Sequence, residues 1–234
     1  MSSSDTSVVL VHGGWADGWS WSKVIQRLAA DRIKTVAAPL PLSSFQDDVA
    51  ALDRALERME GSVVLAGHAY AGAVIAATRS DNVKALVYLA ALAPDEGETV
   101  ADVFYRTEPH PQAPKLAPDD HGLIYLPDMA FSGAFAPNAA AEELVVLAAV
   151  QRPISPACIN VAVPRPLWKD RPAWFLVAEQ DRMIVQDNQR FMAERMQAQV
   201  RSHAFDHTPI VTAPAVVLDV LREAIAAVRA ESAA

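Results

Sequence analysis

Three positions are candidates for a catalytic site because of their residue types and the sequence around them. They are, in chain order, residues 69, 181 and 207. A histidine held by a carboxylate can act as a general base, and His207 in "FDHTPIV" and Asp181 in "FLVAEQDRMIV" each follow a run typical of a strand. The third position lies in "LAGHAYAG", where an apolar run should turn sharply into a helix. Its central residue, Ala69, has neither a hydroxyl nor a thiol, so it cannot attack a substrate. The pattern indicates acid–base chemistry beside a turn that lacks a nucleophile.

Each of these features also has a purely structural interpretation. Glycines at both ends of "GHAYAG" can sharpen a turn without any chemistry, and a lone aspartate after a strand is usually an ordinary loop residue. His203 and Asp206 compete for the roles of base and orienting acid. His203 falls inside an expected strand, which is more typical of packing, and Asp206 adjoins His207, where two side chains seldom meet. His207 and Asp181 therefore remain the stronger candidates for acid–base chemistry.

Alternating apolar runs and amphipathic segments must position these residues. Strands are expected at 7–14, 34–42, 61–67, 83–92, 172–181 and 200–205, and helices at 19–33, 43–60, 69–80, 138–150, 186–197 and 214–232. Strands and helices that alternate through short loops predict an α/β fold, with a mostly parallel sheet covered by helices on both faces.

The alternation stops between Pro94 and Arg171, in a stretch rich in proline and alanine that contains only one convincing helix. We therefore expect a core formed by residues 1–93 and 172–234, and an inserted cap at residues 94–171. Tyr105 and Tyr125 of this insertion, and Trp15 from the first loop, are candidates for the wall of a substrate pocket.

Composition limits the partners that are expected. The chain has 234 residues, of which 52% are hydrophobic and 21% charged, and a net charge of -8 without a basic cluster, so a nucleic-acid partner is not expected. The single cysteine, Cys158, excludes an intramolecular disulfide and is typical of a reducing compartment. The start, "MSSSDTS", lacks the layout of a signal peptide, and no apolar run approaches the roughly 18 residues of a membrane span. We expect a cytoplasmic protein with a small-molecule substrate and no membrane partner; a homodimer is left open.

Metal and cofactor motifs are not found. The sequence contains no HExxH, no cysteine pair and no full GxGxxG, so neither a metal ion nor a dinucleotide is expected.

The motifs "VLVHGGWADGWSW" (9–21) and "GHAYAG" (67–72), with Asp181 and His207 following in order, resemble the α/β-hydrolase family over nearly the whole chain. The resemblance is strongest to small cap-bearing esterases and hydroxynitrile lyases, whose turn reads GHSxxG. It implies an eight-strand-type core with a weak early hairpin strand, and a helical cap over the carboxyl ends of the strands. It also implies an oxyanion hole formed by the backbone N–H groups of Gly14 and Tyr70, with His207 as general base and Asp181 orienting it.

The resemblance implies an esterase-like enzyme of this hydrolase family that acts on a small apolar ester or related carbonyl compound, but Ala69 excludes the covalent serine mechanism. Three interpretations remain open. The chain is a serine hydrolase whose nucleophile was replaced, a variant that uses the His207–Asp181 pair without a covalent intermediate, or a non-catalytic member that binds a small ligand under the cap.

Overall fold

The computed structural model describes residues 6–233, so residues 1–5 of the polar N-terminal stretch and Ala234 lie outside the description. Its centre is a six-stranded sheet with the order β2-β1-β3-β4-β5-β6, in which each neighbouring pair is parallel. The strands are β1 (Thr6–Val11), β2 (Thr35–Ala38), β3 (Ser62–His68), β4 (Val83–Leu89), β5 (Ala173–Ala178) and β6 (Gln199–His203). The predicted α/β architecture with a parallel sheet is confirmed.

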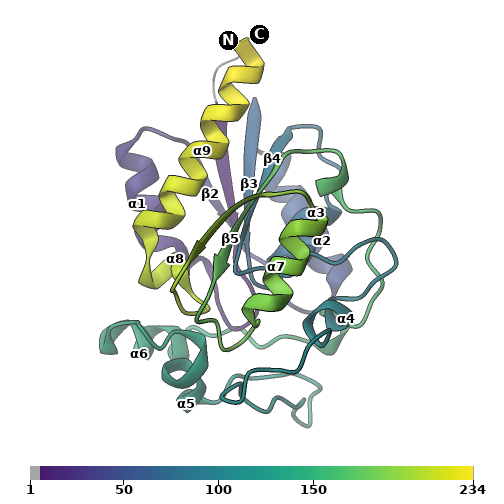
Figure 1. Ribbon diagram of the computed structural model, residues 1–234, viewed down its shortest axis with the longest axis vertical. Coiled ribbons are helices and arrows are strands. Elements are labelled where there is room, and N and C mark those ends of the chain that lie inside the picture. The colour runs from purple at the N-terminus through teal and green to yellow at the C-terminus, as the bar shows by residue number, and fades with distance from the viewer. Residues whose placement is uncertain (1–5, 234) are drawn as a thin grey trace.

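Helices connect the strands and cover the sheet. In Figure 1, α9 crosses in front of the sheet with α1 beside it, whereas α2 and α3 lie behind. The helices outside the segment between β4 and β5 are α1 (Ser22–Ala30), α2 (Phe45–Leu56), α3 (Ala71–Ala77), α7 (Gln186–Arg195), α8 (Pro209–Thr212) and α9 (Pro214–Ala233), preceded by the short η1 (Gly18–Trp21).

The central strands are largely apolar because helices cover them on both faces. Every residue of β1 and β5 is buried, and the pairing of Val8 with Val64 and of Leu10 with Ala66 places β-branched and small residues side by side. Helix α2, expected at 43–60, begins at Phe45, because the Ser44 hydroxyl caps it by accepting a hydrogen bond from the Asp47 N–H. Such packing holds the loops at the carboxyl ends of the strands in fixed positions.

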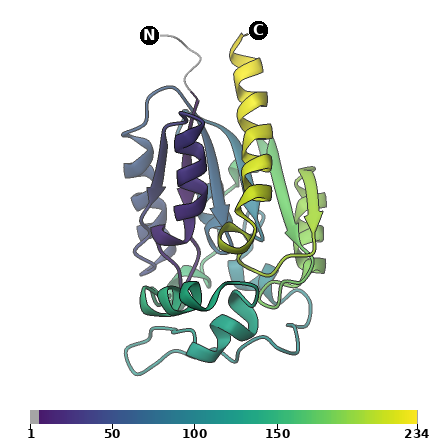
Figure 2. The same cartoon turned by 90° about the vertical axis from the view of Figure 1, so that its left-hand side faces the viewer.

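Most of the segment between β4 and β5, residues 90–172, lies below the carboxyl ends of the strands, as the teal ribbon in Figures 1 and 2 shows, and its last residues return to the amino ends, where Arg171 donates to the Val83 carbonyl. We call it the β4–β5 segment. Its elements are α4 (Val100–Phe104), α5 (Asp128–Ala130), the π-helix η2 (Phe131–Phe135), α6 (Ala141–Ala149), η3 (Pro156–Cys158) and η4 (Leu167–Lys169). Because β4 and β5 are parallel neighbours, this long excursion leaves at the carboxyl end of β4 and returns to the amino end of β5.

Two expectations about the elements need adjustment. Within residues 6–233 the sheet has six strands, and the early hairpin strand that the family resemblance implied is not among them. The expected strand at 34–42 ends at Ala38, because the prolines that follow cannot continue a hydrogen-bonded ladder. The convincing helix at 138–150 forms as α6, over Ala141–Ala149.

Candidate active site

The turn between β3 and α3 has the strained geometry that its glycines suggested. Ala69, at its centre, has a φ of 52°, in the left-handed region that alanine rarely adopts. A Cβ on Gly72 would lie 2.4 Å from the Leu92 carbonyl oxygen, so only glycine allows the helix to approach β4 this closely. The Leu92 N–H in turn donates to the Ala69 carbonyl at 3.0 Å. The sharp turn thus presents the Ala69 methyl group at the carboxyl end of β3.

His207 and Asp181 meet although 26 residues separate them in the chain. The Nδ1 atom of His207 lies 2.8 Å from Oδ2 of Asp181, and both side chains are buried. Each residue follows a strand of the parallel sheet, Asp181 after β5 and His207 after β6, so the topology brings them to the same edge. Because a carboxylate only accepts hydrogen bonds, Nδ1 donates and Nε2 of a neutral His207 is left free to accept a proton.

The carboxylate of Asp181 is fully engaged by hydrogen-bond donors. Its Oδ1 accepts from the backbone N–H groups of Met183 and Ile184 at 2.7 and 2.9 Å, and its Oδ2 accepts from Nε2 of Gln189 at 2.9 Å. Together with His207, four donors surround a carboxylate that no cation neutralises directly. This set fixes the orientation of the acid and therefore of the imidazole.

The loop that carries His207 is held from two directions. Nε2 of His68, the residue before the turn, lies 2.7 Å from the carbonyl oxygen of His207 and donates to it. The carboxylate of Asp206 accepts from the Asn138 N–H at 2.9 Å, which ties the loop to the β4–β5 segment and excludes Asp206 from the imidazole. Burial lowers the pKa of His68 to about 3, so this histidine remains neutral as a structural donor.

The first loop approaches the turn closely enough to share a pocket with it. A Cβ on Gly13 would lie 2.9 Å from the Cβ of Ala69 and 3.5 Å from the backbone nitrogen of Tyr70. Within residues 6–233, the N–H groups of Gly14 and Tyr70 donate no hydrogen bond, and both residues line the same cavity. Two unpaired N–H groups beside the turn can serve as donors to a substrate oxygen.

These residues open onto an apolar cavity of about 120 Å³. The β4–β5 segment supplies most of its far wall, and the first loop supplies Trp15, whose indole N–H donates to the Ile124 carbonyl at 2.9 Å. Tyr105 lines the cavity and is 63% exposed, which places it at the mouth. The lining consists of Gly14, Trp15, Ala69, Tyr70, Leu92, Val100, Ala101, Phe104, Tyr105, Leu116, Ile124, Ile154, Ile159, Met183, Ile184 and His207.

Tyr125 was expected in the pocket wall, but it is not among these lining residues and is 49% exposed. Ile124 forms an antiparallel bridge with Ile154, and side chains of extended backbone alternate between faces. Ile124 therefore faces the cavity, while its neighbour faces outward.

The chain is similar to known proteins over nearly all of its length. The model of the alpha/beta hydrolase family matches residues 8–220. The chain belongs to this family. No curated protein sequence matches it.

Solved structures share the hydrolase fold at low sequence identity. Polyneuridine aldehyde esterase is 18% identical, with a TM-score of 0.77 over 94% of this chain and 98% of its own. A pyrethroid hydrolase from Sphingobium faniae is 19% identical, with a TM-score of 0.78 over 95% and 98%. A variant of tomato methylketone synthase I, in complex with beta-ketoheptanoate, is 16% identical, with a TM-score of 0.80 over 96% and 99%. The predicted resemblance to esterases of this family is confirmed at the level of the fold.

Sequence reasoning missed one polar residue next to the site of this α/β hydrolase. The side chain of Asp48 is fully buried and accepts a hydrogen bond from the Tyr70 hydroxyl at 2.8 Å. The missed signal is positional: Asp48 falls on the same face of the helix as the buried Leu52.

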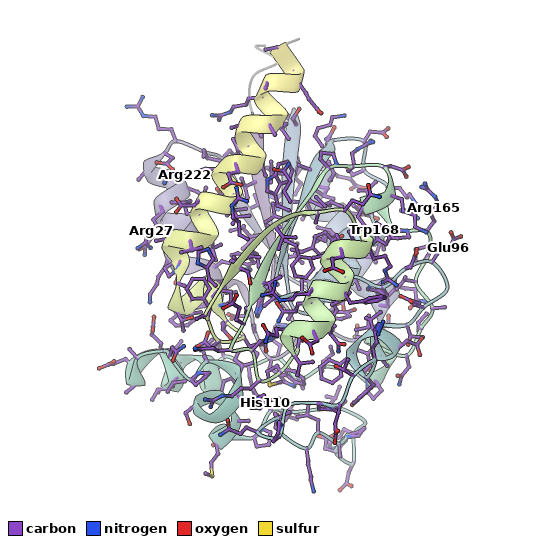
Figure 3. All side chains as sticks on the ribbon, viewed as in Figure 1. Arg27, Glu96, His110, Arg165, Trp168 and Arg222 are labelled. Atoms are coloured by element: carbon purple, nitrogen blue, oxygen red, sulfur yellow. The ribbon has the colours of Figure 1, made fainter. Side chains whose placement is uncertain are left out.

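Two other histidines, His12 and His110, accept hydrogen bonds from backbone N–H groups and do not line the cavity. His12 is buried, its Nε2 accepts from the Leu40 N–H at 3.0 Å, and burial lowers its pKa. His110 lies in the β4–β5 segment at the lower end of the molecule in Figure 3, where its ring accepts from the Gln112 N–H. Over residues 6–233, no three His, Cys, Asp or Glu side chains gather in a way that could hold a metal ion, and no helix there is long and apolar enough to cross a membrane.

Proposed function

We propose that this α/β hydrolase binds a small, largely apolar ester or related carbonyl compound under the β4–β5 segment, which acts as its cap. The His207–Asp181 pair then serves as a general base without a covalent intermediate. One observation carries the proposal: Ala69 and His207 line one apolar cavity, and His207 is hydrogen-bonded to the buried Asp181 at 2.8 Å.

The proposed reaction begins with the substrate carbonyl oxygen between the N–H groups of Gly14 and Tyr70. Nε2 of His207 takes a proton from a water molecule as its oxygen bonds to the carbonyl carbon, and negative charge moves to the carbonyl oxygen. Asp181 stabilises the imidazolium through Nδ1. When the tetrahedral intermediate collapses, the carbon–oxygen bond to the alcohol breaks, and Nε2 returns the proton to the leaving oxygen.

The lining of the cavity supports a neutral, apolar substrate. Among the described lining residues, none is Asp, Glu, Lys or Arg, so the cavity offers no charged side chain to a fixed charge on the substrate. The names of two similar structures, an aldehyde esterase and a pyrethroid hydrolase, are in keeping with carbonyl chemistry in such a site.

A second candidate function is decarboxylation of a β-keto acid, which Ala69 favours because this reaction needs no nucleophile. The bond to the carboxylate breaks, its electrons form an enolate stabilised at the two N–H groups, and protonated His207 then delivers a proton to carbon to give a ketone. The similar structure of a methylketone synthase variant holds beta-ketoheptanoate. The uncharged lining of the cavity favours the first candidate.

Three proteins test these proposals: the Ala69 chain, its His207→Ala variant and its Ala69→Ser variant. With p-nitrophenyl butyrate, we expect slow hydrolysis by the Ala69 chain that His207→Ala abolishes, and faster hydrolysis with an acyl-enzyme burst from Ala69→Ser. Mass spectrometry after quenching should detect the acyl group only on Ala69→Ser. His203→Ala is the matched control, since this residue lies outside the cavity lining.

Other outcomes distinguish the alternatives. Release of carbon dioxide from beta-ketoheptanoate by the Ala69 chain, without ester hydrolysis, selects the second candidate. Activity only in Ala69→Ser supports a hydrolase whose nucleophile was replaced. If no protein turns over either compound, the catalytic proposals fail and a ligand-binding role is the better account.

A further inference from the structure

A buried group of three polar side chains lies directly beside the proposed site. Asp48, in the first turn of α2, is fully buried, and its Oδ2 accepts a hydrogen bond from the Tyr70 hydroxyl at 2.8 Å. The thiol of Cys158 lies 3.6 Å from the same oxygen. Oδ1 accepts from the Leu42 N–H at 2.7 Å. None of these contacts is used by the His207–Asp181 pair.

The position of Asp48 is not explained by the start of the helix. Ser44 already caps α2, and the neighbouring Asp47 occupies an exposed position where it also accepts from the Ser43 hydroxyl. A buried carboxyl group is costly, and burial raises the pKa of Asp48 accordingly. Such a group is tolerated where its polar atoms have hydrogen-bond partners, and the three donors give each carboxylate oxygen at least one.

The three donors come from three different parts of the chain. Leu42 precedes α2, Tyr70 follows the strained turn, and Cys158 belongs to η3 of the β4–β5 segment. Two residues near Cys158, Ile154 and Ile159, line the cavity. Asp48 therefore joins the turn to the wall of the cavity through one carboxyl group.

The hydroxyl and the backbone of Tyr70 lie in different surroundings. Its hydroxyl is anchored at Asp48, and burial raises the pKa of this phenol, which keeps it protonated as a donor. Its backbone lies at the cavity directly after Ala69, whose φ of 52° is a strained conformation that must be held by its surroundings. Anchoring the ring restricts the rotation of the peptide group that carries the Tyr70 N–H.

We propose that Asp48 is a positioning residue that fixes the backbone N–H of Tyr70 through the phenol. Cys158, through its contact with Asp48, couples the position of this N–H to the packing of the β4–β5 segment. The catalytic consequence rests on the proposed function, in which this N–H binds the substrate oxygen. The geometric consequence does not depend on it.

The geometric consequence is tested without substrate by nuclear magnetic resonance. The chain has four tyrosines, so selective ¹⁵N labelling gives four backbone amide signals, and Tyr70→Phe identifies that of Tyr70 by its loss. In Asp48→Ala we expect the Tyr70 signal to shift or broaden while those of Tyr88 and Tyr125 stay in place. Asp48→Asn should restore the original signal, because an amide can still pair with both the Leu42 N–H and the Tyr70 hydroxyl.

Asp53→Ala is the matched control. Asp53 lies on the same helix and accepts a hydrogen bond from the Thr78 hydroxyl at 2.6 Å, away from the cavity lining. It should leave the Tyr70 signal unchanged. An unchanged Tyr70 signal in Asp48→Ala, or an equal change in Asp53→Ala, overturns the proposal.

The catalytic consequence is measured in the Ala69→Ser background with p-nitrophenyl butyrate. Deleting a donor to the developing oxyanion costs about 10²–10³ in kcat, so a displaced donor should lower kcat about tenfold, with KM within about twofold. Asp48→Asn should recover most of this loss, and Cys158→Ala should give a smaller one. If neither the Ala69 chain nor Ala69→Ser turns over a substrate, the proposed function fails and the amide signal alone decides on Asp48. If Ala69→Ser is active and Asp48→Ala leaves its kcat unchanged, the positioning role is refuted.

Discussion

Replacing Asp181 with asparagine should inactivate the base while leaving the protein folded. The change retains Oδ1, which accepts from the N–H groups of Met183 and Ile184, and places an NH₂ group where Oδ2 accepts from His207. The imidazole can then pair only as an acceptor through Nδ1, which moves its proton to Nε2. A protonated Nε2 cannot act as a base, so the His207-dependent rate should fall by about 10³–10⁴.

The cost in stability follows from one other contact. The new NH₂ group would face Nε2 of Gln189, which is also a donor. The Gln189 amide cannot flip to present its oxygen instead, because its Oε1 accepts from the Ala178 N–H and its Nε2 also donates to the Ile184 carbonyl. One buried donor is left without its acceptor, which should lower the free energy of unfolding by about 1–3 kcal/mol. Urea unfolding measures this change.

Asp206→Asn is the matched control, since Asp206 is also buried but hydrogen-bonds to Asn138, Thr208 and Thr212 rather than to the imidazole. Histidine ¹⁵N spectra should show His207 protonated on Nδ1 in the parent and in Asp206→Asn, and on Nε2 in Asp181→Asn. A proton that stays on Nδ1 of His207 in Asp181→Asn would refute the reasoning.

Three further predictions concern packing, pH and specificity. Gly72→Ala should lower the free energy of unfolding by about 1–3 kcal/mol, because its Cβ would lie 2.4 Å from a backbone oxygen. Gly133→Ala is the control: a Cβ there has nothing within 4 Å, so urea unfolding should show a change of less than about 0.5 kcal/mol. His68 has its pKa lowered to about 3 in the folded protein, so the unfolded chain binds more protons below pH 6.5, and stability should fall with decreasing pH by up to about 1.4 kcal/mol per unit until about pH 3. His68→Gln should flatten this dependence between pH 6.5 and 3, and an unchanged slope would assign it to other groups. Ile154→Ala, introduced into Ala69→Ser, should enlarge the cavity and shift the preference in kcat/KM towards p-nitrophenyl esters with longer acyl chains, by up to about fourfold per added methylene. If the ratio of kcat/KM for the butyrate to kcat/KM for the hexanoate is unchanged, the acyl chain lies elsewhere.

The sequence was most informative where regular periodicity and chain order determine position. In a parallel sheet, residues that follow the carboxyl ends of different strands meet at one edge, so the positions of Ala69, Asp181 and His207 after three strands predicted that they lie together. The apolar strands and their covering helices could be predicted for the same reason, because burial on both faces leaves a recognisable pattern.

The irregular parts could not be predicted in this way. The wall of the cavity comes largely from loops of the β4–β5 segment, where a one-residue change in alternation decides that Ile124 rather than Tyr125 faces inward. The burial of Asp48 depends on contacts with Tyr70 and Cys158, which lie 22 and 110 residues away in the chain. Helical spacing could place Asp48 on the buried face of α2, but it could not identify these two distant partners.

The central claim is that the Ala69 chain uses His207 as a base on a carbonyl substrate. Its most direct test is the kcat/KM of the Ala69 chain for p-nitrophenyl butyrate, compared with that of His207→Ala at the same protein concentration and pH. The account predicts a loss of about 10²–10⁴ in the variant, with no acyl-enzyme detected in either protein. Equal rates in the two proteins, beside an active Ala69→Ser variant, would contradict it.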